Sequence, residues 1–562
     1  MDQPERRRES QRAQDNEVIS LNGRDVRREG GSAMTRSLSA PVPTEDAGER
    51  IGSRVVHLGT VHCDEAELDR IMTEALATVA PPEPLFGRVG PDDPSGSAPD
   101  DRVTLLTVAD DAGEASGVDP SGPLFGELPR HQIMALLHPS GRASGGMATA
   151  EVVRRLSQAV SPFTSAERAR ISRLNPLVAE VVRRHRAVGV DLSATALVFR
   201  DHLLLEKLNI LRGLLSLGLP PMRCLVIGKP DPTIYRRRVV ADLVRSGVVV
   251  VDPAEADFSV DRWLKTLPAD CRVVVVDDGG DLAVDVLKQR HPGRGIWPIE
   301  TTTKGIRVLR AAGLLDQVVN LSDTSIKDAM NRRIAVSCVY RLREILRHEA
   351  IEDQGCIVVG YGRLGRSAAS LLAGMGMTVR VAETDRSARR QARDAGFAVF
   401  ADVLAAAADG GSRFLFGCSG QQAVSMDVVR AMASHPVLAT ASSQDLQPVL
   451  RHLRRQAVAH PVRNVGVRYE TPEHSLTVVA DGHAVNLYLA EGVSEPDYDP
   501  FSALILTAII EGASALERGA VPADLPQDPE LLCRQLVELQ RRMSSGRVVR
   551  PETRTSRSRA QP

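Results

Sequence analysis

The chain has 562 residues, of which 25% are charged and 3% aromatic, and a formal net charge of -1. A balanced charge gives no general attraction to nucleic acid or to anionic membranes. So few aromatic residues also disfavour stacking platforms for single-stranded nucleic acid. The length predicts two or three domains, and we expect neither a nucleic-acid nor a membrane partner.

Seven cysteines are scattered along the chain without a CxxC pair. That pattern fits neither a disulfide framework nor a zinc site, so we expect reduced thiols, no metal and a cytoplasmic protein. The N-terminus is charged and lacks the apolar core of a signal peptide. The apolar run "ALILTAII", Ala503 to Ile510, is too short to cross a bilayer by itself.

Residues 1–53 are rich in Arg, Glu, Ser and Gly and lack apolar periodicity, which predicts a disordered tail. Met34 is an alternative start. Residues 54–160 mix a strand and helix pattern with a Pro/Gly/Ser-rich linker and carry no chemical signature. Residues 161–202 have a helical pattern that opens on a capping box, Thr164 followed by Glu167.

β-branched runs alternate with helical stretches from about residue 222 onward. This alternation predicts an α/β fold with parallel sheets. We expect a substrate-type α/β domain over 161–335 and a Rossmann-type dinucleotide-binding domain over 336–490. Helices over 491–544 should return to the first of these domains, and a basic tail over 545–562 should be disordered.

A glycine-rich turn lies in "QGCIVVGYGRLGRSAASLLAGMGMTVRVAETD", residues 354–385. Gly360, Gly362 and Gly365 form GxGxxG between a predicted strand and a predicted helix, the arrangement that cradles a dinucleotide pyrophosphate. Glu383 ends the next strand, at about the distance expected for an acceptor of the ribose 2'-hydroxyl. A carboxylate there repels a 2'-phosphate, so the pattern favours NAD. The alternative is a Rossmann-like unit with an empty turn.

Three further segments, "VDDGGDL", "IETTTKGIRVL" and "VNLSDTSIKDAMNRR", precede the turn. With "GYGRLGR" and "VAETD" they give an order and spacing that resembles the S-adenosylhomocysteine hydrolase (adenosylhomocysteinase) family, from about residue 222 to about 516. The resemblance implies a resident NAD, oxidation of the ribose 3'-hydroxyl of S-adenosylhomocysteine or a related nucleoside, a place in one-carbon metabolism and a homo-oligomer.

The resemblance also implies roles for individual residues. Asp278 corresponds to a proton-transfer carboxylate and Lys327 to the lysine that assists 3'-hydroxyl oxidation, while Glu300 contacts the substrate. Asn331 falls at a substrate-binding position. The residues expected to hold NAD are Gly360, Gly362, Arg363, Leu364, Gly365, Glu383, Thr301, Thr302, Thr303 and Ser419.

The chain departs from the family where the family has histidines. "TASS", Thr440 to Ser443, replaces an Asn/His-containing motif, "GVSEP" replaces a second, and Val226 follows Cys224-Leu225 in place of a third. Losing a general acid or base typically costs about 10²–10⁴-fold in rate. Two alternatives therefore stay open beside a divergent hydrolase: a non-catalytic NAD-binding protein on the same fold, and an NAD-dependent dehydrogenase of another type, with His452 and His460 as its candidates.

Overall fold

A computed structural model describes residues 35–41, 54–78, 102–110, 129–138, 149–251, 259–289, 291, 293–347, 353–442, 444–520 and 528–545. The described chain divides into two compact units, and the boundary in the sequence lies between Ile171 and Ser172. Strand β1, Thr35–Pro41, lies inside the segment for which the sequence predicts disorder. The rest of that segment, the predicted linker and the predicted basic tail lie outside the described residues.

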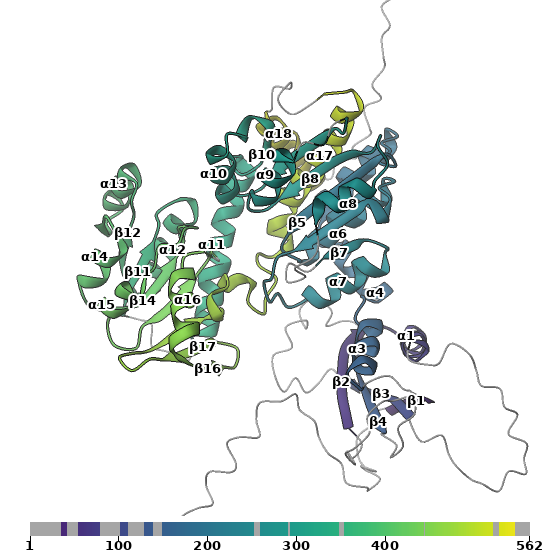
Figure 1. Cartoon of the computed structure of the whole chain (residues 1–562), viewed down its shortest axis with the longest axis horizontal. Helices are drawn as coiled ribbons and strands as arrows, with labels where there is room; N and C mark the ends of the chain where they lie inside the picture. Colours follow the sequence, from purple (N-terminus) through teal and green to yellow (C-terminus); the bar gives the residue numbers. More distant parts are fainter. Residues whose placement is uncertain are drawn as a thin grey trace, which may run out of the picture. The chain divides into compact units, whose positions relative to one another are not determined.

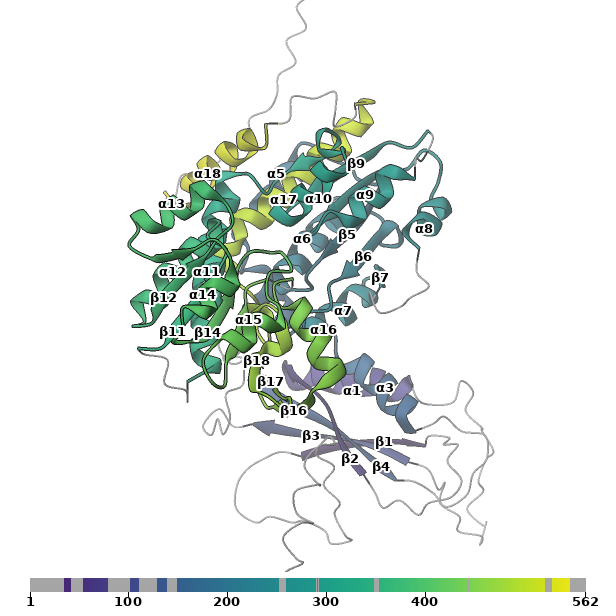
Figure 2. The same cartoon turned by 60° about the vertical axis from the view of Figure 1, so that its left-hand side comes forward.

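The first unit contains a four-stranded antiparallel sheet with the order β1-β3-β4-β2. Helices α1 and α3 lie on one face of it (Figure 2). The predicted capping box is present at α4, because the Thr164 N–H donates to Glu167 and the Glu167 N–H donates to Thr164 Oγ1. The elements are β2 Arg54–His62, α1 Glu65–Ala77, β3 Arg102–Asp110, β4 Arg130–His138, α3 Thr149–Val160 and α4 Ser165–Ser172.

The second unit opens with a six-stranded, wholly parallel sheet in the order β10-β9-β8-β5-β6-β7. Its near-continuous apolar strands are typical of a sheet covered on both faces. The strands are β5 Thr195–Asp201, β6 Cys224–Gly228, β7 Val249–Val251, β8 Arg272–Asp277, β9 Ile296–Glu300 and β10 Val319–Asn320. Its helices are α5 Pro176–Ala187, α6 Leu205–Ser216, α7 Arg236–Arg245, α8 Val260–Thr266, α9 Asp281–Lys288 and α10 Thr303–Ala311.

Strand β5 corrects the sequence prediction of a helical segment over 161–202. Its residues "TALVFRD" are buried at nearly every position, and β5 pairs with both β6 and β8 at the centre of the sheet. A short, fully buried strand shows no alternation of polar and apolar residues, so periodicity alone does not separate it from a buried helix.

Helix α11, Ser325–Ile345, leads from this six-stranded sheet, the first sheet of the second unit, to its second sheet (Figure 1). The second sheet has eight strands in the order β13-β12-β11-β14-β15-β18-β17-β16. Strands β11 to β15 are parallel, as in a Rossmann-type domain, and β17 and β16 add an antiparallel extension. The strands are β11 Gly355–Val359, β12 Thr378–Ala382, β13 Ala398–Phe400, β14 Ser412–Gly417, β15 Val437–Thr440, β16 Val458–Val462, β17 Gly466–Glu470 and β18 Ser475–Val479. The helices are α12 Arg363–Gly374, α13 Arg386–Asp394, α14 Val403–Ala408, α15 Met426–Ala431 and α16 Gln447–Gln456.

Helix α17, Glu495–Glu517, contains the apolar run noted in the sequence. The helix is long and apolar enough to cross a membrane by length and composition, but most of it is buried inside the protein. It packs against α5, α6, β8 and β9, so it returns to the first sheet and forms part of its core (Figure 1). Helix α18, Pro529–Ser544, packs against α17.

Candidate functional site

A pocket of about 980 Å³ lies between the two sheets of the second unit. Each sheet reverses its strand order beside its first strand, between β5 and β8 in one and between β11 and β14 in the other. Ligands of open α/β sheets bind outside the carboxyl ends of the strands at such a reversal. The pocket is lined from both sheets. Asp201 ends β5 and His202 follows it, Asp278 follows β8, Gly360 follows β11 and Ser419 follows β14.

The glycine-rich turn has the geometry that a dinucleotide requires. Gly360 has a φ of +92°, which favours glycine. A Cβ on Gly365 would lie 2.0 Å from the Gly360 carbonyl oxygen, so this glycine lets α12 pack against the turn. A Cβ on Gly362 would meet nothing within 4 Å and would project into open space. The turn therefore leaves room for a phosphate group at the N-terminus of α12, where backbone N–H groups favour anions.

Glu383 lines the pocket beyond β12, and its carboxylate is held by backbone amides. One oxygen accepts from the Tyr361 N–H at 2.6 Å and the other accepts from the Asp385 N–H at 2.8 Å. Two such bonds fix the carboxylate next to the turn. Its position fits an acceptor for the adenosine ribose of NAD.

Three other residues expected at the cofactor also line the pocket: Arg363, Leu364 and Ser419. The Arg363 guanidinium donates to the Ser322 carbonyl at 2.6 Å and pairs with Asp323 at 3.1 Å, which ties α12 to the loop before α11. Ser419 donates through its backbone N–H and its hydroxyl to Asp445. Arg363 therefore contributes to joining the two sheets, a contact that the motif did not predict.

The threonine triplet divides between the pocket and the core. Thr302 and Thr303 line the pocket, whereas Thr301 is buried and its hydroxyl donates to the Asp277 carbonyl. Thr302 caps α10, because its hydroxyl oxygen accepts from the Gly305 N–H at 3.0 Å. The same hydroxyl donates to Glu300 at 2.6 Å.

Glu300 ends β9 and is fully buried, outside the pocket lining. Oε1 accepts from the backbone N–H groups of Thr302 and Gly279, while Oε2 has no hydrogen-bond partner. Burial, together with the charge of Asp277, raises the pKa of Glu300 to about 8. A protonated carboxyl with its hydrogen on Oε2 suits this environment, so we assign the neutral acid at pH 7.

Lys327 lies in the first turn of α11 and lines the pocket, as does Asn331 one turn further on. Its exposed fraction is 8%, and its Nζ lies 4.2 Å from the centre of the Phe501 ring. Burial and the nearby charge of Lys207 outweigh the attraction of Asp278 and lower the pKa of Lys327 to about 8. A pKa near neutrality is suited to proton transfer.

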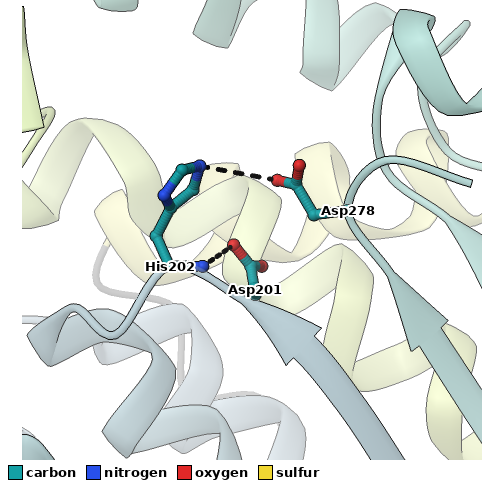
Figure 3. Close-up of side chains that lie close together, drawn as sticks. All are labelled: Asp201, His202 and Asp278. Carbon is teal, nitrogen blue, oxygen red and sulfur yellow. Dashed lines mark hydrogen bonds and ion pairs between the residues drawn. The ribbon is translucent and has the colours of Figure 1, made fainter. Parts of the chain in front are cut away.

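Asp278 faces His202 across the pocket, a pairing that no sequence motif predicts (Figure 3). It forms an ion pair with Lys229, and its Oδ2 lies 4.0 Å from His202 Nε2. Burial alone would raise the pKa of Asp278, but the positive charges of Lys229 and His202 outweigh burial and hold it well below its usual range. Asp278 is therefore a carboxylate at neutral pH.

Asp201, His202 and Asp278 bring three potential metal-ligand atoms within 4.8 Å of one another (Figure 3). Two lysines already satisfy the carboxylates: Lys207 lies 2.8 Å from Asp201, and Lys229 pairs with Asp278. Ammonium groups at these positions would repel a divalent cation. The cluster is better described as a set of ion pairs than as a metal site.

Buried Lys207 links Asp201 to helix α17, because its Nζ also lies 2.8 Å from the Tyr498 hydroxyl. No motif surrounds Lys207 or Tyr498, which are 291 positions apart. His202 lines the pocket although no sequence motif includes it. It follows the central strand β5, whereas the family histidine position identified in the sequence falls at Val226 within β6.

Residues 342–492 match the NAD-binding domain of S-adenosyl-L-homocysteine hydrolase. The chain is 28% identical over 276 residues to an adenosylhomocysteinase from Aeropyrum pernix, which covers 47% of this chain and 65% of the relative, just under two thirds. A Saccharolobus solfataricus adenosylhomocysteinase is 26% identical over 56% of this chain and 77% of its own. An S-inosyl-L-homocysteine hydrolase from Methanopyrus kandleri is 28% identical over 47% of this chain and 64% of its own.

Among solved structures, a 2-hydroxyacid dehydrogenase from Ketogulonicigenium vulgare aligns over 53% of this chain and 95% of its own, with 17% identity and a TM-score of 0.31. That score is too low to bear on the fold. The sequence matches do bear on the family, because the matched residues 342–492 include the glycine turn and Glu383. The chain is therefore similar to S-adenosyl-L-homocysteine hydrolases, most clearly over the NAD-binding domain, and its cofactor is NAD.

Proposed function

We propose that this protein is an NAD-dependent enzyme of the adenosylhomocysteinase type that oxidises the ribose 3'-hydroxyl of a nucleoside-type substrate. One observation carries the proposal: a single pocket is lined by the dinucleotide turn and Glu383 on one side, and by Lys327 and Asp278 on the other. A ribose held between them would lie next to both a hydride acceptor and proton-transfer groups.

NAD would be held by the glycine turn, by the N-terminus of α12 and by Glu383, and when bound it supplies a hydride acceptor. The remaining chemistry belongs to side chains of this chain. Lys327 stabilises negative charge that develops on a hydroxyl oxygen, because its ammonium group is nearly shielded from water. With a pKa of about 8 it can also accept or return that proton.

Asp278 supplies the carboxylate of the site. Lys229 keeps it ionised, so it serves as a proton acceptor or as a partner for a ribose hydroxyl, and it does not serve as an acid. His202 can donate or accept a proton beside it, because its Nε2 lies 4.0 Å from Asp278 Oδ2. The pair thus supplies acid and base functions on the side of the pocket opposite the dinucleotide turn.

The proposal is tested by denaturing the purified protein and measuring released NAD, and then by adding adenosine to the native protein and following NADH absorbance. We expect bound NAD and its reduction by adenosine, together with formation of S-adenosylhomocysteine from adenosine and homocysteine. The absence of NAD under all conditions would refute the proposal.

A non-catalytic NAD-binding protein is the second candidate, and it is favoured by "TASS" at the position of a family Asn/His motif. Bound NAD with neither NADH formation nor condensation would support it. We also propose a cytoplasmic location, because all seven cysteines are free thiols.

A further inference from the structure

Asp231 lies in the loop between β6 and α7 and has an exposed fraction of 4%. Each of its carboxylate oxygens faces a different histidine. Oδ2 lies 2.6 Å from His202 Nδ1, and Oδ1 lies 3.6 Å from His483 Nδ1. Asp231 also lines the pocket. No motif of the sequence includes either Asp231 or His483.

The protonation state of Asp231 follows from this environment. Burial would raise its pKa, but the positive charge of His202 and hydrogen bonds from His202 and His483 outweigh burial and hold the pKa far below the usual range of a carboxyl. Asp231 is therefore a carboxylate, which can only accept hydrogen bonds.

The Asp231 carboxylate determines which nitrogen of the His202 ring carries the hydrogen. A contact of 2.6 Å to an acceptor requires the hydrogen to be on Nδ1. In the neutral ring Nε2 is then the unprotonated nitrogen, and Nε2 is the atom that lies 4.0 Å from Asp278 at the reacting end of the pocket. The carboxylate also fixes the orientation of the ring, because it lies on the side opposite Asp278.

We propose that Asp231 is the positioning residue of the site: it holds His202 with Nδ1 protonated and Nε2 presented to the substrate. His483 supports this arrangement by engaging the second oxygen of Asp231. His483 follows β18 of the second sheet, whereas His202 follows β5 of the first. Asp231 thus links the proton-transfer histidine to the part of the chain that binds the cofactor. The proposal deepens the function proposed above and rests on it for the identity of the reaction.

The first experiment is independent of turnover. The full chain is labelled with nitrogen-15 histidine, the His202 ring signals are assigned by their loss in His202→Gln, and the spectra of the neutral ring are compared. We expect a protonated Nδ1 and an unprotonated Nε2 in the parent protein. In Asp231→Asn the preference of His202 for the tautomer with the hydrogen on Nδ1 should be lost, because an amide can either donate to Nδ1 or accept from it.

Asp242→Asn is the matched control. Asp242 lies on α7, outside the pocket lining, and is also a buried carboxylate with an exposed fraction of 1%. It pairs with Arg212 of α6 at 2.6 Å. Its removal should lower stability and leave the His202 signals unchanged. If Asp242→Asn changes these signals as much as Asp231→Asn does, the effect is structural and the proposal is wrong.

The second experiment measures the reaction. Misalignment of a catalytic group costs up to about 10²-fold in rate, so Asp231→Asn should lower kcat by about 10²-fold with little change in KM. His483→Gln should cause a smaller loss in kcat, because His202 keeps its own bond to Asp231. A parent His202 protonated on Nε2, or an unchanged tautomer in Asp231→Asn, would overturn the proposal. A protein without turnover whose tautomer responds as expected would refute the proposed function and leave the positioning role intact.

Discussion

The two sides of the pocket recognise their ligands by different means. On the dinucleotide side, backbone groups and three glycines from one continuous stretch, residues 354–385, form the turn and carry Glu383. On the substrate side, charged and polar side chains converge from the ends of β5 and β8, the β6–α7 loop, α11 and α17, and the positions range from Asp201 to Tyr498. The first side is specified by local conformation, and the second is specified by long-range packing.

The difference is sharpest in how each side handles charge. Glu383 is the acid that the dinucleotide side needs, and two amides hold it. The substrate side buries several carboxylates and lysines together, so each pKa there depends on its neighbours. Removing one charge should therefore alter chemistry on the substrate side, whereas changes on the dinucleotide side should alter cofactor binding.

The largest effect is expected for Lys327→Met. The loss of this charge removes stabilisation of a developing alkoxide, so NADH formation from adenosine should fall by about 10²–10⁴-fold. Bound NAD, measured after denaturation, should remain. Lys288→Met on the exposed face of α9 is the control and should be neutral. Loss of bound NAD from Lys327→Met would contradict this expectation, because it would show that a charge on the substrate side also determines cofactor binding.

Gly365→Ala should have the next largest effect, on the dinucleotide side. The added Cβ would lie 2.0 Å from a backbone oxygen, and strain of this kind costs on the order of 1–3 kcal/mol. We expect NAD affinity, measured by titration calorimetry on protein freed of cofactor, to fall by about 10²-fold. Gly374→Ala, at the other end of α12, meets nothing within 4 Å and should bind as the parent does. Equal affinities in the two variants would contradict the assigned role of the turn.

Glu383→Gln should weaken NAD binding by about 10-fold, since hydrogen bonds to charged groups contribute roughly 1.5–3 kcal/mol. The amide cannot accept at both ends, so one of its contacts with Tyr361 and Asp385 is lost. Equilibrium titration with NAD measures the change, and Asp394→Asn at the exposed end of α13 is the control. Retention of full affinity would show that this carboxylate does not face the cofactor.

The last effect concerns stability and its dependence on pH, not cofactor binding or turnover. The raised pKa of Glu300, about 8 against an ordinary value of 4.5, means that the folded state keeps a proton that the unfolded state releases. Glu300 therefore lowers the stability of the fold progressively as the pH rises from about 4.5 to about 8. Glu300→Gln should lose less stability than the parent across this window, as measured by urea unfolding at pH 5 and pH 8. An equal loss of stability between pH 5 and pH 8 in both proteins would show that Glu300 is ionised in the folded state across this range.

The same contrast explains what the sequence could predict. The parallel α/β fold, the dinucleotide turn and Glu383 follow from a local pattern, and Lys327 and Asp278 follow from family motifs. His202 could not be predicted, because the strand before it, β5, shows no alternation of polar and apolar residues and falls within a predicted helical segment. Lys229 and Asp231 lie in the loop between β6 and α7, and their partners His202, His483 and Asp278 come from other parts of the chain. The partners of Lys207 and Lys327 are Tyr498 and Phe501, whose positions depend on how α17 packs.

Helix α17 has a consequence for the order of events during synthesis. Its Asp499 accepts hydrogen bonds from the N-terminal amides of α5 at Leu177 and Val178, and its Tyr498 meets Lys207. The ribosome produces the second sheet after β10 and before α17. Domains generally fold as units while the chain emerges. The second sheet can therefore form before α17, which completes the core of the first sheet, has been synthesised. A nascent chain stalled before residue 495 should therefore bind a dinucleotide before it can complete the substrate side.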